Sequence, residues 1–126
     1  MKKQDLINIF EKEFAIIKEK FSIIDVSVLD AGDSNIKNIW HPGVYVFLHP
    51  QRGVIRVGRS FDNARKRALQ HISANTGGVM AGLVSDSEAR LVLFSVINPE
   101  DYFWVAALEV YLENALSPEV PAGRQG

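Results

Sequence analysis

The chain has 126 residues, of which 47% are hydrophobic, so it is long enough for one domain with a substantial core. Its formal net charge of −1 gives no global indication of a nucleic-acid partner. The absence of cysteine excludes a disulfide framework and a thiolate metal site, and it favours a cytoplasmic protein. No stretch is apolar for long enough to span a membrane, and the charged N-terminus lacks the apolar run of a signal peptide.

In chain order, the sequence first predicts an amphipathic helix over residues 4–21, where apolar residues recur at helical spacing between lysines and glutamates. Alternating apolar residues at 24–28 indicate a short edge strand, which a polar loop at 30–38 follows. Strands at 43–49 and 53–58 are expected to form a β-hairpin, because a turn sequence with proline and glycine separates two alternating runs.

A second helix is expected to begin near Ser60 or Asp62, either of which can cap it, and to end near Ser73. For residues 73–90 the sequence predicts a loop and one short helix. The apolar, β-branched run at 90–97 is typical of a buried strand.

The last expected helix begins at Asn98 and Pro99, which combine a cap with a proline at the first helical position, and it ends before Pro118. This order of elements predicts a small α/β (α+β) domain with a mixed three-stranded sheet. The hairpin supplies two strands, the third arrives after a crossover, and helices flank the sheet. Residues 119–126 are expected to be a flexible tail.

Positive charge is concentrated in the hairpin and the helix after it. Between Arg52 and His71 a single acid, Asp62, stands against six basic residues: Arg52, Arg56, Arg59, Arg65, Lys66 and Arg67. Guanidinium groups match phosphate oxygens, so this cluster indicates a phosphate site. A solvated helix face that aids solubility is the alternative explanation.

Arg67 and His71 lie four residues apart and therefore share one face of the second helix. A cation beside an imidazole suits phosphoryl chemistry, because one stabilises charge and the other can move a proton. The alternative is an ordinary surface arginine and histidine.

In the last helix, Glu109 borders the apolar face. That face is marked by Trp104, Leu108, Tyr111 and Ala115, and Glu113 points further away from it. Glu109 is thus either a ligand for a hard divalent cation or a surface acid.

Four elements of the sequence together resemble the GIY-YIG nuclease domain. They are "GVY" at 43–45, "RVG" at 56–58, the Arg67-x-x-x-His71 pair and "ALE" at 107–109. The resemblance implies a nuclease domain over residues 41–118 and leaves residues 1–40 as an N-terminal helical extension. It implies a metal-dependent endonuclease, a hydrolase that cleaves phosphodiester bonds in nucleic acid, with DNA as the expected partner.

The resemblance also assigns roles by position. Tyr45, Arg56, Arg67 and His71 become the catalytic candidates, and Glu109 becomes the ligand of a single Mg²⁺ or Mn²⁺ ion. Gly43 and Gly58 become structural glycines, and Arg52, Arg59, Arg65 and Lys66 become candidates for nucleic-acid binding. The catalytic candidates and Glu109 are then expected to line one cleft. His49 shares a strand face with Tyr45, and we expect it to be a surface histidine beside the turn.

The chain departs from the family pattern at three places. Arg56 stands where the family carries a tyrosine, no asparagine follows Pro118, and one extra residue separates Gly58 from Arg67. Arginine stays protonated and is a poor base, so these departures predict weak cleavage. A catalytically inactive relative that keeps the fold and binds nucleic acid or a protein partner is the first alternative. A protein-interaction module unrelated to nucleic acid is the second.

Overall fold

The computed structural model describes residues 1–73 and 78–121 of the chain. A four-stranded sheet lies at its centre, in the order β1-β4-β2-β3. The strands are β1 (Phe21–Ser27), β2 (Gly43–His49), β3 (Gly53–Ser60) and β4 (Arg90–Val96). Every neighbouring pair is antiparallel. The expected class, a small α+β domain, is confirmed.

The expected mixed, three-stranded sheet was wrong in two respects. The edge strand predicted near residues 24–28 does form, as β1, but it pairs along its length with β4 and becomes a fourth strand. The crossover after β3 passes over β2, so β4 lies on the far side of β2 and pairs with it antiparallel. A parallel pair would require β4 to lie beside β3.

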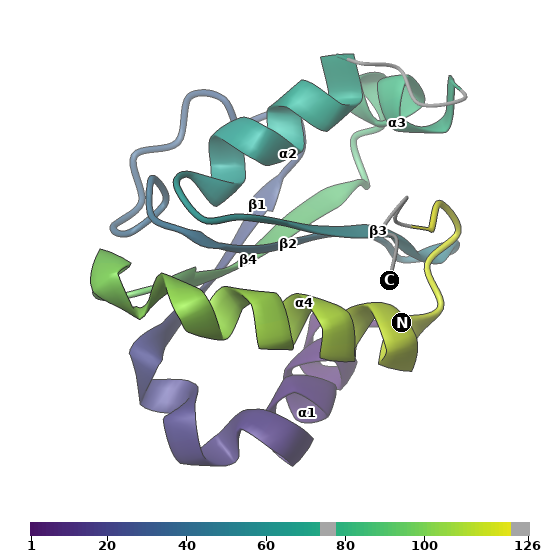
Figure 1. The fold of residues 1–126 in the computed structure, drawn as a ribbon. Coiled ribbons are helices and arrows are strands. Elements are labelled where there is room, and N and C mark those ends of the chain that lie inside the picture. Colours follow the sequence, from purple (N-terminus) through teal and green to yellow (C-terminus); the bar gives the residue numbers. More distant parts are fainter. Residues whose placement is uncertain (74–77, 122–126) are drawn as a thin grey trace.

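Helices cover both faces of the sheet (Figure 1). One face carries α2 (Ala64–Ser73), α3 (Val79–Gly82) and the short η3 (Leu83–Ser85), and the other carries α1 (Lys3–Phe14) and α4 (Phe103–Leu116). The remaining helical turns are η1 (Ala15–Lys20) and η4 (Pro99–Tyr102). None of the helices in the described ranges is long and apolar enough to cross a membrane.

Strand β2 shows how the two cores are built. All of its residues are buried, and successive side chains point to opposite faces of the sheet. Tyr45 and Phe47 therefore join the core under α2, whereas Val44 and Val46 join the core under α4. Gly43 begins the strand where β4 approaches closely, since a Cβ there would lie 2.5 Å from the Phe94 carbonyl oxygen.

The N-terminal residues form part of the same unit. We expected residues 1–40 to be an extension outside the domain, yet they supply β1 and the helix α1. Leu6 and Phe10 of α1 are buried in the core with α4. The helix expected over 4–21 ends at Phe14, and the tighter turns of η1 let Phe21 enter the sheet with its ring 5.7 Å from that of Phe10.

The start of α2 is capped by a different residue from those expected. The Asn63 side chain accepts a hydrogen bond from the Lys66 N–H at 3.0 Å. The Ser60 hydroxyl instead accepts from the backbone N–H groups of Asp62 and Asn63, at 3.1 and 3.0 Å, which shapes the loop before the helix. Asn98 does cap the last helical segment, because its side chain accepts from the Glu100 N–H at 3.0 Å.

Candidate functional site

A tyrosine–histidine pair lies between β2 and α2. Tyr45, fully buried in β2, places its hydroxyl in direct hydrogen-bonding contact with Nδ1 of His71 in the last turn of α2. Their rings meet edge to face, with centroids 5.4 Å apart. Gly58 lies opposite Tyr45 in β3, and a Cβ there would come within 2.2 Å of the Tyr45 hydroxyl oxygen. Gly58 thus leaves the space that the phenol occupies.

Two arginines flank this pair. Arg56 lies two residues before Gly58 in β3, opposite Phe47, and so faces α2 like Gly58. Its Nε atom is buried and forms no hydrogen bond within the part of the chain that the structure describes. Arg67 lies one helical turn before His71 on the exposed side of α2, where it donates to Gln70 at 3.3 Å. Their positive charges act on both members of the pair.

Both members of the pair are neutral near pH 7, Tyr45 chiefly because it is buried and His71 because of burial and nearby positive charge. Burial raises the pKa of Tyr45 to about 12, although the charges of Arg56 and Arg67 oppose the rise and the charge of Glu109 adds to it. Burial, followed by the charges of the same arginines, lowers the pKa of His71 to about 4. The phenol is therefore a proton donor, and the neutral imidazole is available as an acceptor.

Glu109 lies in the other helical layer, on α4. It is only 5% exposed, and its Oε1 atom is 3.8 Å from Nε of Arg59. Arg59 follows Gly58 in β3 and faces α4, so this ion pair lies against the opposite face of the edge strand from His71. The structure thus brings Tyr45, His71 and the two flanking arginines together. The charge of Glu109 acts on Tyr45 from that other face.

The apolar face of α4 is also rotated from the expected one. The helix buries Val105, Leu108 and Leu112, and Glu109 is buried with them instead of bordering the face. Trp104 and Tyr111, which we expected to be central, are only partly buried and pack toward α1. The Tyr111 hydroxyl donates to the Ile9 carbonyl at 2.7 Å.

A divalent ion at Glu109 would have few protein ligands. In residues 1–73 and 78–121, no group of three or more histidine, cysteine, aspartate or glutamate side chains is placed to hold a metal. Mg²⁺ often takes one or two carboxylates and completes its shell with water and substrate phosphate. Glu109 fits such a role only together with a bound phosphate, and Arg59 competes for its carboxylate.

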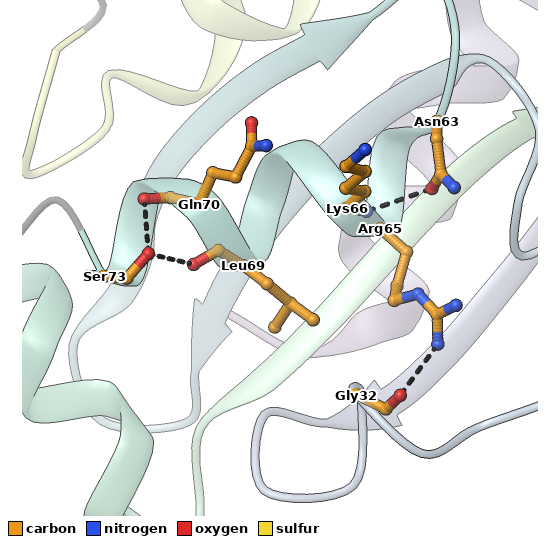
Figure 2. Close-up of a pocket in the computed structure, with 7 residues that line it drawn as sticks. All are labelled: Gly32, Asn63, Arg65, Lys66, Leu69, Gln70 and Ser73. Carbon is orange, nitrogen blue, oxygen red and sulfur yellow. Dashed lines mark hydrogen bonds between the residues drawn. The ribbon is translucent and has the colours of Figure 1, made fainter.

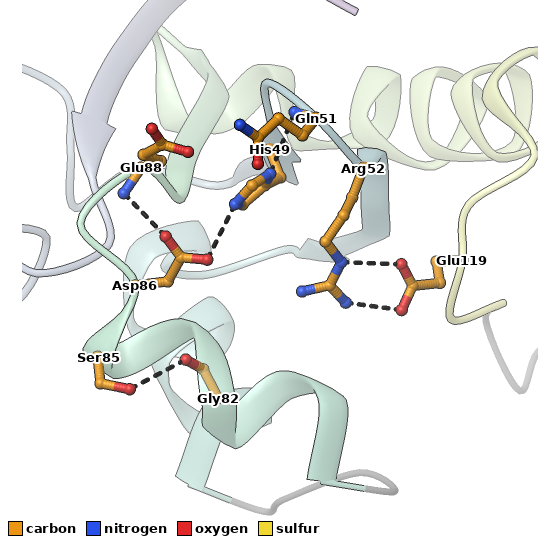
Figure 3. Close-up of polar contacts among 8 residues, drawn as sticks. All are labelled: His49, Gln51, Arg52, Gly82, Ser85, Asp86, Glu88 and Glu119. Carbon is orange, nitrogen blue, oxygen red and sulfur yellow. Dashed lines mark hydrogen bonds and ion pairs between the residues drawn. The ribbon is translucent and has the colours of Figure 1, made fainter.

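The candidates for nucleic-acid binding divide into structural and exposed groups. Arg52 forms two hydrogen bonds with Glu119, at 3.2 and 2.7 Å (Figure 3). Arg65 donates through Nη1 to the carbonyls of residues 31, 32 and 34, each at 3.1 Å, and so anchors the loop before β2. Figure 2 shows Arg65 bonded to Gly32 at the rim of a surface pocket, with Lys66 extending from the same helix. Lys66 is exposed.

His49 was expected on the surface, and that expectation was wrong. It is 5% exposed, and Nε2 donates to Asp86 Oδ2 at 2.9 Å while Nδ1 accepts from the Gln51 N–H at 3.2 Å (Figure 3). This pattern fixes the neutral tautomer that carries its proton on Nε2. Asp86 was not foreseen, because residues 73–90 show no periodic pattern, and residues 74–77 lie outside the described ranges.

Sequence reasoning also missed a group of exposed rings near Arg59. The Arg59 guanidinium lies 4.7 Å from the ring centroid of Phe61. Phe61 in turn contacts Tyr102, and Tyr102 contacts Phe103. The run of aromatic residues at 102–104, directly after a helix-start signal, was the available indication.

Comparisons with protein-family models, with curated proteins and with solved structures find no match to this chain.

Proposed function

We propose that this domain binds the phosphodiester backbone of nucleic acid at the Tyr45–His71 pair and hydrolyses it slowly, as a relative of the GIY-YIG nucleases. The observation that carries the proposal is a neutral, hydrogen-bonded phenol–imidazole pair beside Arg56 and Arg67. Neither arginine forms an ion pair with an acid in the described ranges. Phosphate oxygens match the donor geometry of guanidinium groups, so two arginines can hold a phosphate.

The pair supplies a route for one proton. A water molecule attacks phosphorus and gives its proton to the Tyr45 oxygen as that hydroxyl gives its own proton to His71. The bond from phosphorus to the leaving oxygen breaks, and solvent protonates that oxygen. Arg67 stabilises the negative charge that builds on the phosphoryl oxygens, and Arg56 adds affinity for the bound phosphate.

Substrate binding would strengthen the base. The charges of Arg56 and Arg67 contribute to the low pKa of His71. A phosphate bound between them would offset those charges and raise the pKa of the imidazole toward its ordinary value. A base with a pKa nearer the working pH accepts a proton more effectively. The imidazole would therefore be most basic when substrate is present.

Glu109 is the residue that would hold a divalent ion. When bound, Mg²⁺ or Mn²⁺ supplies positive charge to the scissile phosphate. The carboxylate is held near β3 beside Arg59, and its charge already acts on Tyr45. Replacing Glu109 with glutamine should therefore weaken Mn²⁺ binding, and equal affinities of the two proteins would refute this assignment.

The presence of Arg56 supports a second candidate function, in which the domain binds nucleic acid and cleaves it little or not at all. A guanidinium in the place of the family's tyrosine adds phosphate affinity and cannot act as a base. Loss of a general base typically lowers the rate by roughly 10²–10⁴-fold. Arg56→Tyr should consequently accelerate cleavage and loosen binding.

The test is single-turnover cleavage of a labelled oligonucleotide with Mg²⁺, alongside salt-dependent binding. We compare the wild-type protein with three variants, Arg56→Tyr, Tyr45→Phe and Glu109→Ala. We expect slow cleavage by wild type, faster cleavage by Arg56→Tyr and none by the other two. Fast cleavage by wild type that Arg56→Tyr slows would make Arg56 a working catalytic residue. If no variant cleaves or binds any nucleic acid, the nuclease proposal is wrong and an interaction module becomes the leading explanation.

A further inference from the structure

Three large aromatic rings lie exposed in one contiguous group, which we call the aromatic surface: Phe61, Tyr102 and Phe103. Their exposed fractions are 47%, 49% and 57%. The ring centroids of Phe61 and Tyr102 are 5.9 Å apart, and those of Tyr102 and Phe103 are 6.2 Å apart. Phe61 follows the end of β3, and the other two lie where η4 passes into α4. Contiguous exposed rings generally mark a binding surface, unlike single exposed apolar residues.

Arg59 connects the aromatic surface to the Tyr45 site. Its guanidinium lies 4.7 Å from the centroid of the Phe61 ring, and its Nε lies 3.8 Å from Glu109 Oε1. The preceding residue, Gly58, is the one that packs against the Tyr45 ring. Because β3 is an edge strand, a chain of phosphates that crosses the Tyr45 site and passes around this end of β3 would bring its neighbouring bases to the rings.

The charge beside the rings decides which partner fits them. An apolar segment of a protein would gain little from the Arg59 guanidinium, whereas a polyanion with flat apolar groups gains both from that charge and from the rings. A single-stranded nucleic acid has this composition, because its backbone pairs with cations and its bases stack on aromatic side chains. A duplex keeps its bases stacked on one another and cannot offer them to these rings.

We propose that the substrate is unpaired, single-stranded nucleic acid whose bases stack on Phe61, Tyr102 and Phe103 while its backbone reaches Arg56 and Arg67. This inference rests on the proposed phosphate site. It adds that the nucleic acid bound there is single-stranded and not a duplex. The stacking residues touch bases and take no part in the transfer of the proton.

Equilibrium binding of end-labelled oligonucleotides at one fixed salt concentration tests the proposal. The probes are a single strand, the same strand with abasic positions throughout its centre, and the matching duplex. The abasic strand keeps every phosphate and lacks the bases. We expect it to bind roughly tenfold more weakly than the intact strand, the effect of losing at least one base stack.

Two substitutions at one position separate stacking from apolar contact. Phe103→Leu keeps an apolar side chain without an aromatic face and should lose roughly tenfold affinity for the single strand, whereas Phe103→Tyr should keep it. Neither should alter binding of the abasic strand. Because Phe103 is exposed, both variants should fold, and their thermal unfolding checks this.

The outcomes distinguish this inference from the proposed function. If intact and abasic strands bind equally, and Arg67→Ala weakens both, the phosphate site stands and base stacking is wrong. If the duplex binds as tightly as the single strand and Phe103→Leu changes nothing, the aromatic surface serves another partner. If no probe binds the wild-type protein, the proposed function itself fails.

Discussion

The β2–β3 hairpin carries two groups built from the same kinds of side chain. Near the turn, His49 bonds to Asp86 and Arg52 bonds to Glu119, so each basic group faces an acid. Further along the strands, Arg56 lies near His71 with a second arginine on α2, and no acid pairs with either arginine in the described ranges.

The difference between the two groups is one of charge balance. In the turn group each basic side chain faces a carboxylate, so the group has no excess of positive charge to hold an anion. Its bonds hold the turn against the segment after η3 and against the C-terminal segment. The Tyr45 group keeps an excess of positive charge near a buried phenol, and only part of that excess is offset by the charge of Glu109. Residue type alone would have made both groups candidate sites, and the placement of acids separates them.

Replacing one arginine in each group should give the largest contrast. Arg67→Ala is expected to lower the single-turnover cleavage rate by about 10²–10³-fold, the usual effect of removing one group that stabilises transition-state charge. Arg52→Ala should leave the rate unchanged, because Arg52 is engaged with Glu119. Equal losses in the two variants would mean that the turn group also takes part in substrate binding.

The glycine under Tyr45 should be the next most sensitive position. Gly58→Ala would force a methyl group into the Tyr45 ring, and overpacking of this kind destabilises by about 1–3 kcal/mol. Gly82→Ala is the matched control, since a Cβ there meets nothing within 4 Å. Urea denaturation measures both. A Gly58→Ala protein as stable as the control would show that Tyr45 can move freely, and the tight pair with His71 would not hold.

His71 should lower the stability of the fold at acid pH, and Tyr45 should lower it at alkaline pH. His71 has a folded-state pKa of about 4 against an ordinary value of 6.5, so the unfolded chain takes up a proton first as pH falls. Its contribution is fully present above pH 6.5 and is lost as the pH drops toward 4. Tyr45, with a pKa raised from 10.0 to about 12, favours the folded state below pH 10.0 and destabilises it as the pH rises toward 12.

Denaturation of wild type and His71→Gln across this range measures the histidine effect. Wild type should lose more stability than the variant between neutral and acid pH, by a modest amount because His71 is only partly buried. Parallel curves would show that the imidazole titrates normally. A bound oligonucleotide should make the loss in wild type smaller, because a phosphate that raises the pKa of His71 brings the folded value closer to the unfolded value of 6.5.

The smallest expected effect belongs to the turn group. Glu119→Gln removes one partner of a surface ion pair and should lower the free energy of unfolding by less than about 1 kcal/mol. Cleavage and nucleic-acid binding should stay unchanged. Tighter binding of nucleic acid by this variant would show that Arg52, once released, can join the phosphate site.

Local patterns in the sequence were enough to predict the elements that build the Tyr45 site. Alternation placed Tyr45 on one strand face, and the four-residue spacing placed Arg67 and His71 on one helix face. The crossover and the position of β1 were not predictable in this way, because they depend on which strand lies next to which. Strand pairing is decided by packing between residues far apart in the sequence.

The partners of the charged residues could not be predicted from the sequence, because they also lie far apart along the chain. Arg52 meets an acid 67 residues away, and Arg65 bonds to carbonyls of a loop more than 30 residues earlier. The rotation of α4 had a different cause. The helix packs on the sheet and also against α1, so apolar residues occupy more than one of its faces and their period does not single out the buried one.

Strand β3 is an edge strand, and its exposed backbone has consequences for self-association. The N–H groups of Glu119 and Val120 donate to the carbonyls of Val54 and Ile55, at 3.1 and 2.7 Å, and so cover its first half. The second half carries Arg56 and Arg59, and charged side chains discourage one edge strand from pairing with another. The same arginines that we assign to nucleic acid therefore also help to keep the molecules apart in solution. Neutralising both would favour growth of the sheet from one molecule into the next.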